Sequence, residues 1–143
     1  MTATVIVFTL LCGAAIALQA QFTGTMDREM GTLESVFVTY VGGGIIVAVA
    51  MLVAGGGNLE NWRRLPPYVF AAGALGLVII GTIAFTVNRI GLVRALVFIT
   101  TSQYLFSAVM SHFGLLGADL KPIDLGRVAG MALMVGGMYL VVR

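Results

Sequence analysis

The stretch LESVFVTYVGGGIIVAVAMLVA, residues 33–54, decides the fold. Glu34, at its entry, is its only charged residue, and almost all the others are apolar or small. As a helix the stretch would extend about 33 Å, at 1.5 Å per residue, which is enough to cross the ~30 Å hydrocarbon core of a bilayer. It therefore predicts a transmembrane helix.

Four more apolar runs lie before and after this stretch. With it, they predict five transmembrane helices at about residues 3–22, 33–54, 68–87, 92–113 and 128–142. The chain is 59% hydrophobic and 10% charged, with a mean hydropathy of +1.05, whereas soluble domains are about 25% charged. These values exclude a soluble fold. We expect an all-α membrane protein whose residues 1–143 form a single transmembrane domain.

Two connecting segments carry most of the polar residues between the first three helices. We expect Asp27, Arg28 and Glu29 to form a polar turn after the first helix. The segment GGGNLENWRRLPP, residues 55–67, should end the second helix at its glycines and start the third at its prolines. Its Trp62, beside two arginines, is typical of an anchor at the membrane interface.

The Lys and Arg residues divide evenly between the two membrane faces. With five spans, Arg63, Arg64, Lys121 and Arg127 fall on one face, and Arg28, Arg89, Arg94 and Arg143 fall on the other. Because the Lys/Arg bias of short loops sets orientation, a balanced chain can insert both ways. An even split also arises by chance, so dual topology is a hypothesis at this point.

Two copies inserted in opposite orientations could pair antiparallel. Such a pair would reproduce, with one sequence, the inverted repeats that many transporters carry within a single chain. Five helices alone enclose little room for a pathway, so a transport function would require a homodimer. We therefore expect a half-transporter bundle that an antiparallel partner completes.

Neutral polar residues lie inside the predicted helices, whereas no carboxylate or lysine falls at mid-helix. Thr100, Gln103 and Ser107 share one helix face with Ser111, because their spacing follows the helical period. The candidate substrate-binding residues are Gln19, Thr23, Thr100, Gln103, Tyr104 and Ser107. Hydroxyls can instead bond back to their own helix, and glutamines can bridge neighbouring helices. A primary amide carries two donors and an acceptor, which its own helix cannot all satisfy.

Several functions are not expected from this sequence. Its single cysteine, Cys12, and single histidine, His112, lie on different predicted helices, so no nucleophile with a matching base can be assembled. We expect no enzyme activity, no cofactor and no metal site. The basic residues are scattered, which argues against nucleic acid as a partner.

The end of the chain resembles a known family. SHFGLLG, residues 111–117, is followed by Lys121, Pro122 and Arg127 and then by the spaced glycines Gly130 and Gly136. This pattern is similar to the YdcZ-like branch of the drug/metabolite transporter superfamily, small bacterial inner-membrane proteins. Further matching positions are Gln19, Ser35, Phe37, Gly42, Pro66, Gly73, Gly76 and Gln103.

The chain departs from the family pattern at four positions. Thr23 stands where the family has Asn, Asn88 where it has Pro, Ser102 where it has Gly, and Ser111 where it has Asp. The family is known for dual-topology single genes, paired genes and fused halves. The resemblance thus implies a multi-pass protein of the bacterial inner (plasma) membrane. It also implies that, within the lipid bilayer, the chain pairs antiparallel with itself or with a related paralogue.

Two functions remain open from the sequence. The first is a transporter subunit that moves a small polar or zwitterionic solute, with Gln19 and Gln103 facing a central cavity shared by the homodimer. The second is a non-transporting accessory or assembly subunit of a larger membrane complex. Small residues at four-residue spacing, such as Gly44 with Ala48 and Ala132 with Gly136, would let its helices pack closely against a partner.

Overall fold

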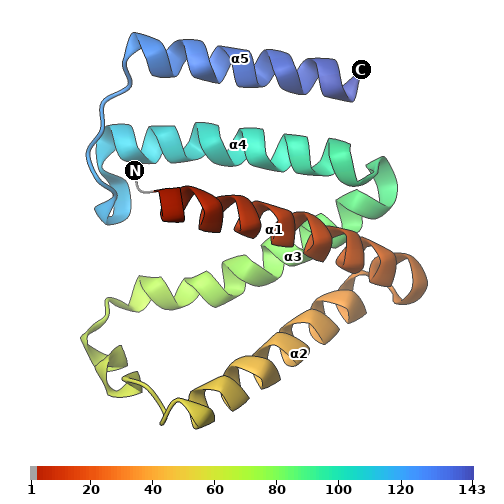
Figure 1. Cartoon of the computed structure of the whole chain (residues 1–143), viewed down its shortest axis with the longest axis vertical. Coiled ribbons are helices and arrows are strands. Elements are labelled where there is room, and N and C mark those ends of the chain that lie inside the picture. Colours follow the sequence, from red (N-terminus) through yellow and green to blue (C-terminus); the bar gives the residue numbers. More distant parts are fainter. Residues whose placement is uncertain (1–2) are drawn as a thin grey trace. The chain divides into compact units, whose positions relative to one another are not determined.

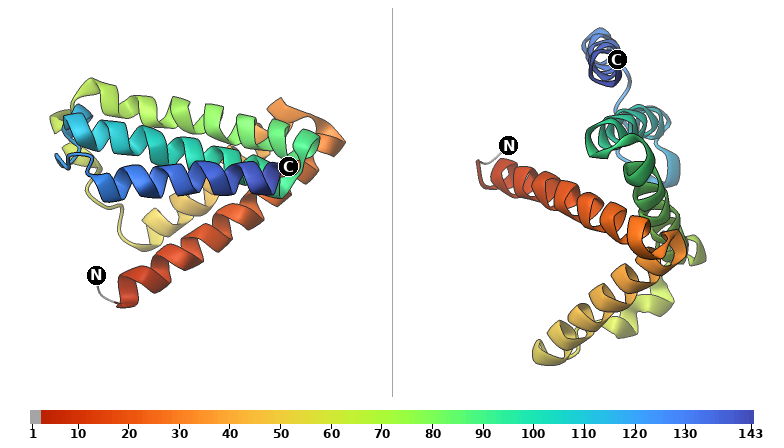
Figure 2. Two further views of the ribbon diagram at one scale, coloured as in Figure 1. Left: turned by 90° about the horizontal axis from the view of Figure 1, so that it is seen from above. Right: turned by 90° about the vertical axis from the view of Figure 1, so that its right-hand side faces the viewer.

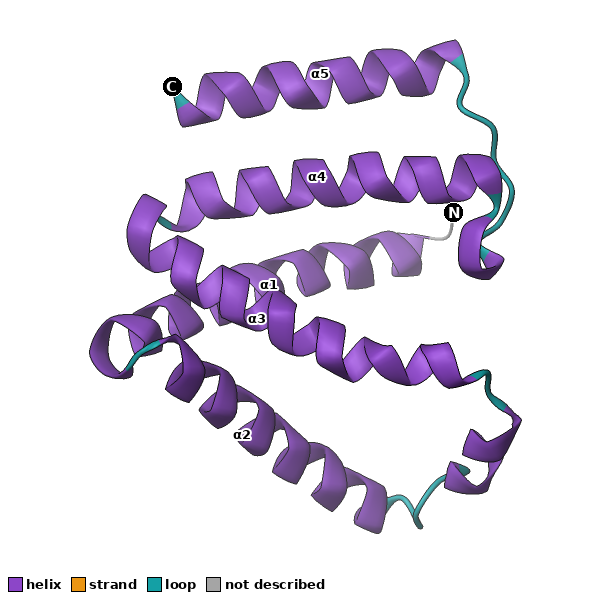
Figure 3. Ribbon diagram, turned by 180° about the vertical axis from the view of Figure 1, so that it is seen from behind, coloured by secondary structure: helices purple, strands orange, loops and turns teal. Residues whose placement is uncertain are grey.

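The computed structural model describes residues 3–143, except for the side chain of Glu60. The described residues form helices joined by loops and turns, without strands (Figures 1 and 3). Its elements are α1 (Ala3–Met30), α2 (Thr32–Val53), η1 (Leu59–Arg64), η2 (Pro67–Phe70), α3 (Ala71–Ile90), α4 (Leu92–Phe113), η3 (Leu115–Gly117) and α5 (Leu125–Val142). The five α-helices are long and apolar enough to cross a membrane, which confirms the predicted all-α class and its five spans. Contacts divide the chain into two compact units, Met1–Arg89 and Ile90–Arg143.

The first unit is built around the junction between α1 and α2. Gly31 is the only residue between these helices, and its φ of +101° is a conformation that favours glycine. The chain reverses there, so α1 and α2 diverge from a common end (Figures 1 and 2). The predicted end of the first helix at residue 22 was wrong, because Asp27, Arg28 and Glu29 belong to the last turns of α1. The carboxylate of Asp27 is buried there and has hydrogen-bond partners on the other two helices of the unit.

Helix α3 packs against both α1 and α2, close to their junction at Gly31. A Cβ added to Gly24 of α1 would lie 2.9 Å from the Cβ of Val87 on α3. On the other side, a Cβ added to Gly81 of α3 would lie 3.5 Å from Val36 on α2. Small residues therefore set the closest approaches. The buried residues of these helices are Ala20, Thr23, Gly24, Asp27, Ser35, Val36, Ile83, Ala84 and Val87.

Other helix boundaries differ from the prediction by a few residues. The third span begins with the 3-10 turn Pro67–Phe70 and continues to Ile90, three residues past the predicted end. Helix α5 begins at Leu125 because Asp124 caps it, its Oδ1 accepting from the backbone N–H of Arg127 at 2.7 Å. The predicted bounds of α4 were right.

In the second unit, α4 and α5 run antiparallel and side by side (Figures 1 and 3). The loop between them folds back onto the end of α4. The N–H of Lys121 donates to the carbonyl oxygen of Ser111 at 2.8 Å, and the N–H of Ile123 donates to Nδ1 of His112 at 3.0 Å. These two bonds fix where α5 starts, and therefore where Arg127 lies.

Most apolar side chains along the helices are exposed, as suits a surface in contact with lipid. Several glycines on the helix surfaces also have empty space beside them. A Cβ would meet no described atom within 4 Å at Gly13, Gly42, Gly43, Gly44, Gly73, Gly130, Gly136 and Gly137. These faces can therefore accept another helix at close range.

Candidate functional site

Two glutamines lie near the middle of their transmembrane helices. Gln103 is at the centre of α4, and Gln19 is within about 4 Å of the centre of α1 along its axis. Both side chains are exposed, and neither amide makes a hydrogen bond within the described part of the chain. Exposing an amide to hydrocarbon without partners costs several kcal/mol. Each amide therefore calls for a partner molecule, either another subunit, water or a solute.

The candidate hydroxyl groups bond to their own helices. Thr23 is buried, and its Oγ1 donates to the carbonyl oxygen of Gln19 at 3.0 Å or of Ala20 at 3.1 Å. Thr100 donates to the carbonyl oxygen of Leu96 at 2.8 Å, and Ser107 donates to that of Gln103 at 2.7 Å. Their hydrogens are therefore engaged, although each oxygen can still accept a hydrogen bond.

The first unit has a cavity of about 450 Å³ between its diverging helices. Its polar side chains are Gln19 of α1 and Thr39 and Tyr40 of α2, and Ile80 of α3 closes one wall. Gly43 and Gly44 have no side chains and so leave room for this cavity. A neighbouring cavity of about 340 Å³ shares Gln19 and Thr39 and also reaches Thr23. The structure thus brings Gln19 together with Thr39 and Tyr40.

Sequence reasoning did not select Thr39 and Tyr40 as site residues. The spacing of Ser35 and Thr39 by one turn was the available signal for Thr39, and its Oγ1 does donate to the carbonyl oxygen of Ser35 at 2.8 Å. For Tyr40 no sequence signal existed, since its position depends on how α2 meets α3. A Cβ on Gly76 of α3 would overlap the Tyr40 hydroxyl.

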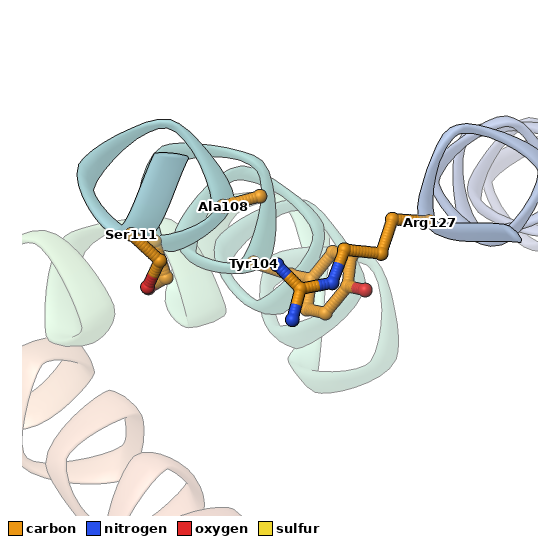
Figure 4. Close-up of a pocket in the computed structure, with 5 residues that line it drawn as sticks. Tyr104, Ala108, Ser111 and Arg127 are labelled. Atoms are coloured by element: carbon orange, nitrogen blue, oxygen red, sulfur yellow. The ribbon is translucent and has the colours of Figure 1, made fainter. Parts of the chain in front are cut away.

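The second unit has a smaller, more polar cavity of about 180 Å³. It is lined by Tyr104, Ser107, Ala108, Ser111 and Arg127. Figure 4 shows Arg127 extending from α5 toward Tyr104 on α4. Of the four candidates on α4, Tyr104 and Ser107 share this cavity, whereas Thr100 and Gln103 do not line it. Gln19 and Thr23 belong to the first unit, and the assignment of all six residues to one site stays a prediction.

A polar cluster near Gly31, where α1 and α2 meet, joins the three helices of the first unit. The buried carboxylate of Asp27 accepts from the hydroxyl of Thr32 on α2 and, at 2.7 Å, from the side-chain amide of Asn88 on α3. The Asn88 oxygen in turn accepts from Nε of Arg28 at 3.3 Å. The sequence could not reveal this cluster, because Asp27 and Asn88 are 61 residues apart.

Metal-binding side chains do not gather in this protein as far as it is described. Residues 3–143 contain no group of three or more His, Cys, Asp or Glu side chains that could hold a metal ion. The candidate groups are instead amides, hydroxyls and one guanidinium, which bind through hydrogen bonds and charge. Such groups suit reversible recognition of a solute.

Comparison with known families identifies the chain. The model of the family described as "Putative inner membrane exporter, YdcZ" matches residues 4–140. The chain belongs to this family. Searches of curated proteins and of solved structures gave no match. Membership confirms the resemblance seen in the sequence, and with the five spans it places the protein in the inner membrane.

Two departures from the YdcZ-family pattern lie at positions that the structure makes informative. Asn88, where proline was expected, donates to Asp27 and so provides a hydrogen bond that proline could not. Ser111, where aspartate was expected, lines the cavity that contains Arg127. Both changes therefore alter the polar interactions of this chain.

Proposed function

We propose that the protein is one subunit of an exporter for small polar or zwitterionic solutes, acting as a dual-topology antiparallel homodimer. In this proposal Gln19 and Gln103 face a central site shared by the two copies. The protein carries out transport and catalyses no reaction. Membership of an exporter family supports the transport part of the proposal.

The observation that carries the proposal is the state of the two glutamine amides. Each lies near the middle of a membrane helix, is exposed, and has no hydrogen-bond partner in the described chain. A solute pathway would supply water and solute as partners, whereas lipid would not. Each amide can donate hydrogen bonds to a passing solute and accept hydrogen bonds from it, and the amide itself is uncharged.

Antiparallel pairing is supported by charge and by the open faces. The even division of Lys and Arg between the two membrane faces allows both orientations. The glycine faces, including Gly42–Gly44 on α2 and Gly136 on α5, leave room for helices of a second copy. Two copies would provide ten spans and the inverted symmetry typical of transporters. The open faces also suit an accessory subunit, so an export measurement is needed to separate the two functions.

Replacing Gln19 or Gln103 with leucine should lower the export rate about tenfold or more. The loss of one hydrogen bond to the solute in the transition state, about 1.4 kcal/mol, corresponds to a factor of ten. The measurement compares solutes released by cells that express wild-type protein, Gln19→Leu, Gln103→Leu or no protein, by untargeted mass spectrometry. A solute released above background by wild type should be released at about one tenth of the wild-type rate or less in both variants.

Gln21→Leu provides the matched control. Gln21 is also exposed on α1, but its Nε2 donates to Thr25 of the same helix at 3.5 Å, so its loss should leave export unchanged. Wild-type export by Gln103→Leu, with normal expression and assembly, would rule out the site assignment. If no solute distinguished wild type from cells without the protein, the accessory-subunit function would be favoured instead.

A further inference from the structure

Arg127 is a charged residue held in place by backbone groups. It lies in the first turn of α5, is half-buried, and extends toward α4 (Figure 4). Its Nη1 donates to the carbonyl oxygens of Lys121 at 2.7 Å and Pro122 at 3.4 Å. Asp124, the carboxylate nearest in sequence, accepts instead from the backbone N–H of Arg127. Within the described residues, the guanidinium thus bonds only to carbonyl oxygens, and its charge is not neutralised by an ion pair.

The cavity beside Arg127 offers further hydrogen-bond donors. The hydroxyls of Tyr104 and Ser111 line it and make no hydrogen bond within the described chain, so both can donate to a ligand. Ser107 already donates to its own helix and can add an acceptor. One oriented guanidinium and two free hydroxyls form an anion-binding set. No carboxylate lines the cavity to oppose it.

The cavity extends from headgroup level toward the middle of the span. Tyr104 is nine residues before Phe113, the last residue of α4, which places it about 13 Å along the helix from its end. A lipid phosphate shares the chemistry of an anionic solute but stays at headgroup level, near the helix end. Ser111 and Arg127 lie within about 3 Å of their helix ends, at headgroup level, whereas Tyr104 extends the cavity past the reach of a lipid phosphate. The cavity volume of about 180 Å³ is below that of sites for drug-sized ligands, roughly 300–1,000 Å³.

We propose that this cavity binds the carboxylate group of the exported solute. The free N–H groups of Arg127 pair with the carboxylate oxygens, and Ser111 and Tyr104 donate to the same group. The assignment rests on the proposed export function and narrows its substrates to carboxylates, including zwitterions. Solutes whose only charge is positive are excluded from this cavity by Arg127.

The test uses the full-length protein in nanodiscs of phosphatidylcholine, with sodium acetate as the probe. The Nε–Hε NMR signal of Arg127, assigned by its loss in Arg127→Lys, should shift and saturate as acetate is added. Ser111→Asp places a carboxylate beside Arg127 without removing the guanidinium, and should weaken acetate binding at least about tenfold. Leu116→Asp is the matched control, since Leu116 is an exposed residue of η3 at the same end of α4 and outside the cavity lining, and it should bind acetate within about twofold of wild type.

Three results would overturn the proposal. They are a shift that does not saturate, equal binding by Ser111→Asp and wild type, and an equal shift with choline chloride in place of acetate. Addition of phosphatidylglycerol to the nanodiscs tests the lipid source: a shift that appears with this lipid and is insensitive to acetate would assign the site to a headgroup and reject the solute. Because the assay measures binding, its failure is separable from a failure of export or of dual topology. Loss of dual topology with intact acetate binding would reject the proposed function alone.

Discussion

Replacing Asp27 with alanine should lower the free energy of unfolding of the first unit by about 2–4 kcal/mol. The buried carboxylate accepts from Thr32 on α2 and Asn88 on α3, and hydrogen bonds to an ionised group contribute more than those between neutral groups. Alanine would leave both donors unpaired where three helices meet. The loss is measured by chemical or thermal unfolding of the purified protein in detergent, followed by circular dichroism.

Glu29→Ala is the control for this substitution. Glu29 lies in the same last turns of α1 but is exposed, so its replacement should change stability by less than about 0.5 kcal/mol. Asn88→Leu should be destabilising, and adding Asp27→Ala to it should cost less than the sum of the two single changes, because the two side chains share one bond. Equal stability of Asp27→Ala and Glu29→Ala would show that the cluster does not hold the helices together.

Adding one methyl group at Gly24 should destabilise the protein by about 1–3 kcal/mol. The Cβ of Gly24→Ala would lie 2.5 Å from Cγ1 of Val87 and 2.9 Å from its Cβ. Rotation of the valine side chain can move Cγ1 but not Cβ, so the backbones of α1 and α3 must separate. The expected result is a lower melting temperature and a broader size-exclusion profile.

Gly13→Ala is the matched substitution on the same helix. A Cβ at Gly13 meets nothing within 4 Å, and alanine is a better helix former than glycine by about 0.5–1 kcal/mol. This variant should therefore be as stable as wild type or more so. If Gly24→Ala and Gly13→Ala had the same melting temperature, the close contact between α1 and α3 would be contradicted.

The sequence was sufficient to predict the five spans because hydropathy and length determine them. Residues 92–113 were predicted with the bounds that α4 has. The end of α1 was missed because hydropathy scores each polar residue by itself. The burial of Asp27 is compensated by Thr32 on α2 and Asn88 on α3, and no local pattern reports such bonds between helices.

The candidate site was predictable only within single helices. Helical spacing placed Ser107 and Ser111 on one face of α4, and both line the same cavity. The contribution of Arg127 was not predictable, because its direction depends on loop bonds from Lys121 and Ile123 to the end of α4. Likewise, Tyr40 joins Gln19 because α1 and α2 diverge from Gly31 at an angle that spacing does not encode.

These features support one interpretation of the function of this protein. Neutral amides near mid-membrane, a cationic cavity in the second unit and open glycine faces are what half of an exporter would need from its own sequence. The even Lys/Arg balance is what would let the other half be a second copy. Family membership supports an export role in general, and the proposed dimer would account for a complete pathway built from 143-residue subunits.

The most direct test of the antiparallel homodimer is the accessibility of single cysteines from each side of the membrane. In a Cys12→Ala background, one cysteine is placed at Asn58 between α2 and α3, or at Glu29 before the α1–α2 junction; these positions lie on opposite faces of the membrane and both are exposed. An impermeant maleimide applied to intact spheroplasts should label about half of the molecules at each position, and permeabilisation should expose the rest. Complete labelling of one position and none of the other would establish a single orientation and contradict the antiparallel homodimer.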